Sequence, residues 1–212
     1  MKLPAILNIL TLMFLLSSCS SYLTSSENVG KVKNSYNKIL VVGRSKDKTA
    51  RIKFENNVVN ELAANGVNAI ASHATKSIIN INKKYSESEL VSLKKSLVSN
   101  KYDGVLVTNL INTEEYTDVL PGGSSTAYIP TRVGRFGRYL TYYPITTWEP
   151  DQIKTGTKFI FESTLYRLSE NPGENLQWVG RFEVKDPSSL EKTVKNYAKD
   201  LTSALVKSSV SN

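Results

Sequence analysis

KILVVG, residues 38–43, is the stretch of sequence that says most about the fold. After Lys38 it is an uninterrupted apolar run, rich in β-branched side chains, that ends at Gly43. Such a run is typical of a strand buried on both faces of a parallel sheet. Downstream, Phe54, Val58 and Leu62 recur every four residues before Gly66, which predicts a helix over about 47–65. The fold is therefore expected to begin with a buried strand and a covering helix.

The same alternation continues through the first half of the chain. Residues 67–72 are predicted as a second strand and residues 105–111 as a third. Between them a capping box at 86–89 opens a helix, whose apolar stripe consists of Leu90, Leu93, Leu97 and Val98. Strands that alternate with helices pair in parallel through right-handed crossovers, so a βαβαβ half is expected.

The second half changes its hydrophobic period. Residues 158–168 alternate weakly, residues 171–173 form a turn, and apolar side chains alternate again from Leu176 to Val184. This pattern predicts an antiparallel hairpin with one wet face. Asp186-Pro187 then predicts the start of a C-terminal helix with a buried stripe at Leu190, Val194, Tyr197, Leu201 and Leu205. The predicted class is α/β, a mixed sheet flanked by helices.

The N-terminus has the organisation of an export signal. Lys2 is followed by an apolar run over 9–16 and by small residues before Cys19, so residues 1–18 are predicted to be a signal peptide. The run is shorter than the roughly 20 residues that a membrane-spanning helix needs. Cys19 is the only cysteine and His73 the only histidine, which argues against a disulfide and against a thiol-based catalytic or metal site.

Leu16-Ser17-Ser18-Cys19 resembles a lipobox. The resemblance implies cleavage before Cys19, a diacylglyceryl group on its sulfur and an acyl chain such as palmitate on the new amino end, an effectively permanent anchor. Ser20, where inner-membrane lipoproteins tend to have Asp, implies the outer membrane of a Gram-negative bacterium, with the chain facing the periplasm. Residues 19–33 are expected to hold the lipidated cysteine and a flexible tether.

Composition fits one domain over residues 34–212. The chain has 212 residues, 40% of them hydrophobic, and a formal net charge of +8. An exported chain is not expected to meet nucleic acid, so the partners suggested by the charge are anionic lipid headgroups, lipopolysaccharide phosphates, peptidoglycan carboxylates or an acidic protein. A solvated basic surface without a specific partner is the alternative.

An insertion at about 112–156 is the least ordinary segment, because a connection this long is usually functional or disordered. One interpretation is an adhesive arm that binds an envelope protein, a glycan or anionic lipid through aromatic and Arg side chains. The other is a long two-stranded hairpin that extends the sheet, or a mobile loop. The candidate binding residues are Tyr128, Arg132, Arg135, Phe136, Arg138, Tyr139, Tyr142, Tyr143 and Trp148.

No catalytic constellation is recognisable in the sequence. No residue near His73 in the sequence is recognisable as a nucleophile that it could activate. Glu114 and Glu115 are adjacent and point to opposite faces of a strand, unlike the facing carboxylates of a glycosidase. Residues 42–45 are the only phosphate-loop candidate, with one glycine after a strand. No zinc or calcium spacing appears. We therefore expect neither enzymatic activity, nor a metal, nor a cofactor.

Three segments resemble bacterial envelope lipoproteins with a domain of unknown function. They are Leu176-Gln177-Trp178-Val179-Gly180, residues 186–192 and residues 61–67. More distantly they resemble the periplasmic domains of the curli-secretion channel lipoprotein and of penicillin-binding-protein activators. The resemblance implies an α/β fold and a binding role, and it transfers no site residues.

Four hypotheses follow for the function. The first is a non-enzymatic binding or assembly module of the cell envelope, with homo-oligomers as one form. The alternatives are an activator of a peptidoglycan synthase, a secretion-channel subunit that forms a ring, and an envelope hydrolase that uses carboxylates such as Glu114, Glu115 and Asp118.

Overall fold

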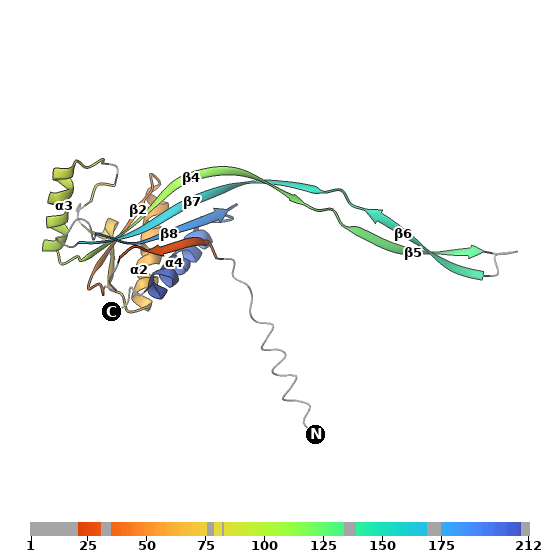
Figure 1. Ribbon diagram of the computed structural model, residues 1–212, viewed down its shortest axis with the longest axis horizontal. Helices are drawn as coiled ribbons and strands as arrows, with labels where there is room; N and C mark the ends of the chain where they lie inside the picture. Colours follow the sequence, from red (N-terminus) through yellow and green to blue (C-terminus); the bar gives the residue numbers. More distant parts are fainter. Residues whose placement is uncertain are drawn as a thin grey trace, which may run out of the picture. The chain divides into compact units, whose positions relative to one another are not determined.

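The computed structural model describes residues 21–30, 35–75, 79–81, 83–133, 139–168 and 175–208. They belong to two compact units, shown in Figure 1. Unit 1 comprises the residues up to Asn112 and those from Phe159 onward, and unit 2 comprises residues 113–158.

Unit 1 is built on a mixed sheet, as predicted, and the sheet has six strands. Its strands lie in the order β1 (Leu23–Asn28), β8 (Leu176–Lys185), β7 (Gln152–Arg167), β4 (Gly104–Leu120), β2 (Ile39–Arg44) and β3 (Ala69–Ala71). β3 and β4 both pair in parallel with β2, whereas β1 pairs antiparallel with β8. The predicted βαβαβ half and the β7–β8 hairpin are confirmed.

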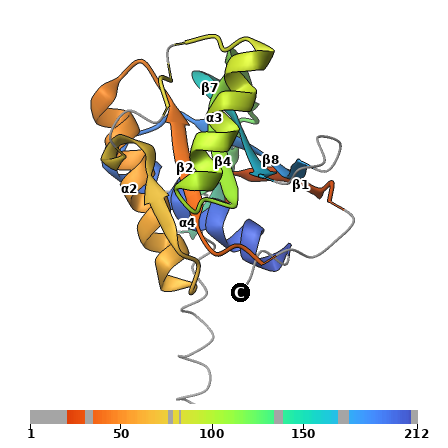
Figure 2. The same cartoon turned by 90° about the vertical axis from the view of Figure 1, so that its left-hand side faces the viewer.

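Helices cover both faces of the sheet. α2 (Lys48–Ala64) and α4 (Leu190–Lys207) pack with Ile39 and Val41 of β2, while α3 (Glu87–Ser99) packs with Leu40 and Val42. Figure 2 shows α3 in front of the sheet and α4 behind it. Residues 39–42 of β2 are thus all apolar because successive side chains enter two different cores.

Local capping explains where the helices begin and end. The Asp47 carboxylate accepts hydrogen bonds from the amides of Thr49 and Ala50 at the start of α2, and Gly66 beyond its end has a φ of +78°. The predicted capping box of α3 is present. α4 starts later than expected, because the Ser189 hydroxyl, and not Asp186-Pro187, caps it.

The stripe expected on α3 is only partly buried. Leu97 is buried in the core, whereas Leu90 and Val98 are about half exposed. α3 covers strands β2 and β4 with a narrow face, so the sequence period overestimated the contact.

The expectation of a flexible tether over residues 19–33 is wrong for its central part. Residues 23–28 form β1, and the Asp200 carboxylate of α4 accepts a hydrogen bond of 2.7 Å from the Tyr22 amide. A Ser/Asn-rich segment resembles a linker in composition. The open edge of β8 nevertheless provides backbone partners for it.

Unit 2 corrects the expectation of an insertion without clear structure. It contains β5 (Ser124–Val133) and β6 (Tyr139–Trp148), which pair antiparallel, with the adjoining parts of β4 and β7. The long two-stranded hairpin named in the second interpretation is present. Across the part of the chain that the structure describes, none of the helices has the length and apolar character needed to cross a membrane.

Candidate functional site

The β5–β6 hairpin displays large apolar side chains on both of its faces. Residues paired across an antiparallel ladder share a face, and the faces alternate along each strand. The pairs Ser124–Trp148, Tyr128–Pro144 and Pro130–Tyr142 therefore define one face. The pairs Ala127–Ile145 and Ile129–Tyr143 define the other face.

These side chains are exposed within their unit. Trp148 is 77% exposed and Tyr128 67%, with Tyr142 close behind on the same face. Ile129, Tyr143 and Ile145 on the opposite face are each about half exposed. Exposed apolar side chains gathered in this way make the hairpin a candidate interaction surface. We call the first set the aromatic face and the second the aliphatic face.

The structure separates the predicted binding residues into three groups. Tyr128, Tyr142 and Trp148 share the aromatic face, and Tyr143 lies on the aliphatic face. Arg132 lies in β5 and Tyr139 lies in β6, but the described structure covers only the backbone of these two residues. Arg135, Phe136 and Arg138 lie outside the described residues.

Proline limits pairing along the outer edges of the hairpin. A proline has no N–H, so it fits a two-stranded ribbon without losing a ladder bond only where its nitrogen faces outward. Pro130 in β5 and Pro144 in β6 therefore interrupt the row of donors on the two outer edges. This favours contact through the faces of the hairpin over edge-to-edge strand addition.

The carboxylates of the hydrolase hypothesis lie on β4. Glu114 forms an ion pair of 2.8 Å with Lys158, while its neighbour Glu115 points to the opposite face of the strand. Among the residues described, no group of three or more His, Cys, Asp or Glu side chains is placed to hold a metal ion.

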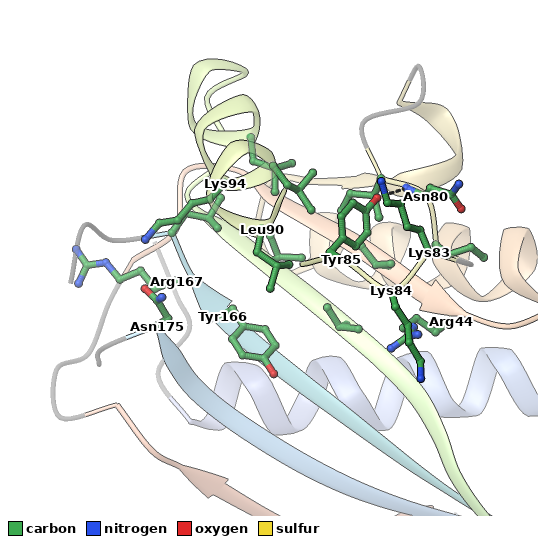
Figure 3. A pocket seen from close by; sticks show the side chains of 18 residues that line it. Arg44, Asn80, Lys83, Lys84, Tyr85, Leu90, Lys94, Tyr166, Arg167 and Asn175 are labelled. Carbon is green, nitrogen blue, oxygen red and sulfur yellow. Dashed lines mark hydrogen bonds between the residues drawn. The ribbon is translucent and has the colours of Figure 1, made fainter. Parts of the chain in front are cut away.

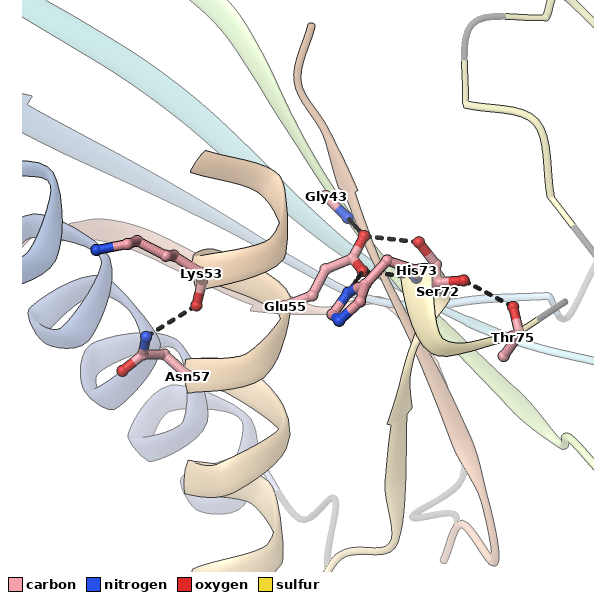
Figure 4. A network of polar contacts seen from close by, with 7 residues as sticks. All are labelled: Gly43, Lys53, Glu55, Asn57, Ser72, His73 and Thr75. Atoms are coloured by element: carbon pink, nitrogen blue, oxygen red, sulfur yellow. Dashed lines mark hydrogen bonds and ion pairs between the residues drawn. The ribbon is translucent and has the colours of Figure 1, made fainter. Parts of the chain in front are cut away.

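His73 takes part in a buried polar network centred on Glu55 (Figure 4). The fully buried Glu55 carboxylate accepts hydrogen bonds from the Gly43 amide at 3.0 Å, the Ser72 hydroxyl at 2.6 Å and the His73 amide at 3.0 Å. Its Oε2 also lies 2.7 Å from Nδ1 of His73. The network ties α2 to the ends of β2 and β3.

This network also bears on the phosphate-loop candidate at residues 42–45. A phosphate loop offers free backbone N–H groups to its ligand. The Gly43 amide is instead bonded to Glu55 within the protein. Sequence reasoning missed Glu55, which has no signal of its own in the helical pattern of α2.

A basic groove lies on the α3 side of unit 1 (Figure 3) and has a volume of about 760 Å³. Its floor is apolar and includes Val42, Leu97, Val105 and Val107 from the core beneath α3. All of its charged lining residues are cationic: Arg44, Lys83, Lys84, Lys94 and Arg167. An apolar floor within a cationic rim suits an anionic group attached to an apolar chain.

One wall of the groove is fixed by local bonds. The Tyr85 hydroxyl accepts a hydrogen bond of 2.7 Å from the Asn80 amide. Lys83 forms an ion pair of 2.5 Å with Glu89, and this hydrogen bond raises the pKa of Lys83 and lowers that of Glu89. The cations come from β2, the loop before α3, α3 and β7, so no sequence motif predicted the groove.

The sequence matches no protein-family model and no curated protein. Among solved structures, it is similar to a variant PelC dodecamer from Paraburkholderia phytofirmans, with a TM-score of 0.44, 12% identity, and 84% of this chain and 95% of that chain covered. A second PelC dodecamer from the same organism gives a TM-score of 0.42 at 10% identity, covering 84% and 96%.

A PDZ domain protein from Parabacteroides distasonis gives a TM-score of 0.32 at 11% identity, covering 79% of this chain and 31% of that one. At such low identities and scores, none of these similarities assigns a role to this chain.

Proposed function

We propose that the chain is a lipid-anchored, non-enzymatic binding and assembly module of the bacterial cell envelope, and that it engages a protein partner through the β5–β6 hairpin. The observation that supports this proposal best is the exposure of large apolar side chains on both faces of the hairpin. An isolated two-stranded hairpin is marginally stable in water, so a partner that covers a face would also stabilise it.

The aromatic face is the better candidate for the contact. Tyr and Trp are enriched at protein interfaces, because they bring large contact area at low cost in conformational entropy. Tyr128, Tyr142 and Trp148 are also more exposed than the apolar side chains of the opposite face.

The position of β1 sharpens the anchoring part of the proposal. Tyr22 is held to α4 by its bond to Asp200, and it is the third residue after Cys19. Three residues span at most about 11 Å when fully extended. A lipid on Cys19 would therefore keep unit 1 close to the bilayer surface.

Envelope crosslinking of two matched triple variants tests the hairpin. Tyr128→Ser/Tyr142→Ser/Trp148→Ser removes the aromatic face, and Ile129→Ser/Tyr143→Ser/Ile145→Ser is the control on the other face. We expect the first variant to lose the protein partners that wild type captures, or its own self-association, and the control to retain most of them. Capture unchanged in both variants would contradict binding through the hairpin.

The anchor has a test of its own. Mass spectrometry of the N-terminal peptide from membrane fractions should find a triacylated Cys19 in wild type and none in Cys19→Ser. An unmodified Cys19 in the soluble fraction would refute the anchor and leave binding through the hairpin open.

A further inference from the structure

A second cavity of about 530 Å³ lies in unit 1, at the carboxyl end of β2. It is bordered by the first turns of α2 and α4 and by β4 and β7. Its apolar lining includes Phe54, Leu110, Phe159, Phe161, Val194 and Tyr197. Small-molecule sites have this size and character, and in α/β sheets they favour the carboxyl ends of strands.

The aromatic wall of the cavity is held in place. The Tyr197 ring meets Phe54 and Phe161 edge-on, with centroids 5.6 and 5.5 Å apart. The Tyr197 hydroxyl lies 3.0 Å from the Ser163 hydroxyl, which in turn lies 2.6 Å from that of Thr108. Burial raises the pKa of Tyr197, so the wall presents a neutral phenol.

Charge at the cavity is predominantly positive. Arg44, Lys46 and Arg51 line it, against Asp47 as the single acidic lining residue. The Asp47 carboxylate is already engaged by the amides of Thr49 and Ala50. Glu55, one turn after Arg51, directs its oxygens to Gly43, Ser72 and His73.

Arg51 has an unsatisfied donor at this cavity. Its Nε is buried and donates to no acceptor among the residues that the structure describes. Buried polar groups are nearly always paired, so this orphan donor indicates an acceptor that the described residues do not supply. A planar carboxylate matches the guanidinium geometry.

We propose that this cavity binds a small amphiphile that has an apolar body and a single carboxylate. The carboxylate lies at Arg51, with Arg44 and Lys46 adding positive potential, and the apolar body lies between Phe54, Phe161 and Tyr197. The site is separate from the hairpin and does not depend on the anchor.

Calorimetric titration of the mature chain with three ten-carbon amphiphiles, below their micelle concentrations, tests the charge requirement. We expect decanoate to bind with one-to-one stoichiometry, and decyl maltoside and decyltrimethylammonium to bind at least about tenfold more weakly, because neither supplies the anion. No binding of decanoate, or equal binding of all three, would overturn the proposal.

Two variants and two matched controls locate the site. Arg51→Met and Val194→Trp should each weaken decanoate binding by about tenfold or more, through loss of the donor and filling of the cavity respectively. Arg181→Met removes an exposed arginine on β8, and Leu93→Trp fills the basic groove instead; both should leave binding unchanged. If decanoate binding were lost only in Leu93→Trp, the ligand would be assigned to the basic groove and this site would be refuted.

Wild-type amide shifts provide a readout that does not depend on how a variant folds. Decanoate should move the NMR signals of Gly43 and Thr193, which line this cavity, more than that of Val107, which lines the groove. The reverse pattern would overturn the proposal.

Discussion

Strands β2 and β6 are both rich in apolar side chains, yet their environments are opposite. Ile39, Leu40 and Val41 of β2 are completely buried between two helical layers, whereas Tyr142, Ile145 and Trp148 of β6 are exposed within unit 2. Apolar character predicts a strand in both places. The strand becomes part of a core only where other layers of the fold cover it. An apolar strand with no covering layer in its own unit leaves its side chains exposed.

The largest expected effect contrasts one buried and one exposed side chain. Leu106→Ala in β4 should lower the free energy of unfolding by about 2–5 kcal/mol, because it opens a cavity in a fully buried site. Ile145→Ala in β6 should change it by less than about 0.5 kcal/mol. Urea unfolding followed by circular dichroism measures both. Equal losses would show that the isolated chain already covers the aliphatic face.

A smaller effect on stability is expected when the buried carboxylate of Glu55 and the partly exposed one of Glu114 are each replaced by an amide. Glu55→Gln should cost about 1–3 kcal/mol, because the new amide group faces donors that now bond to a carboxylate. Glu114→Gln in unit 2 breaks a partly exposed pair with Lys158, worth at most about 1 kcal/mol. Thermal unfolding of the two variants ranks them, and a more damaging Glu114→Gln would refute the structural role of Glu55.

The smallest effect at neutral pH is expected at Tyr36, whose buried hydroxyl has no hydrogen-bond partner among the described residues. Tyr36→Phe should be neutral or slightly stabilising at pH 7, since it removes an unsatisfied polar group. Urea unfolding at pH 7 measures this, and a clear loss of stability would reveal a partner for the hydroxyl.

The same substitution has a larger effect in alkali. Desolvation raises the pKa of Tyr36 to about 12, from 10.0 for an unperturbed tyrosine. Unfolded chains release this proton first, so wild-type stability should fall as the pH rises from about 10 to 12. The Tyr36→Phe variant should lose less stability than wild type over that pH interval. Parallel profiles of stability against pH for the two proteins would contradict the raised pKa of Tyr36.

Much of unit 1 could be predicted from local patterns. The buried run at 38–43, the helical repeat through Phe54, Val58 and Leu62, and the box at Ser86 and Glu89 all depend on neighbours within a few residues. β1 could not be predicted, because its polar sequence becomes a strand only through the free edge of β8, about 150 residues later. The cap of α4 was misplaced because Asp186-Pro187 and Ser189 are both acceptable local signals.

The candidate sites divide in the same way. The aromatic residues of the hairpin stood out in the sequence because the segment has an unusual composition. The division of those residues between two faces required the register of β5 on β6. Glu55, the basic groove and the cavity at Arg51 gave no sequence signal, because each joins side chains from separate elements.

Apart from β1, the sequence by itself determined the order of strands and helices in unit 1, because periodicity and capping act over one or two turns of chain. It also determined which residues are apolar. Only the tertiary structure decided which of them are covered, since the same kind of strand is core in β2 and surface in β6. It also decided where cations meet apolar walls, because pairing in the sheet and helix packing bring together residues that are distant in the chain.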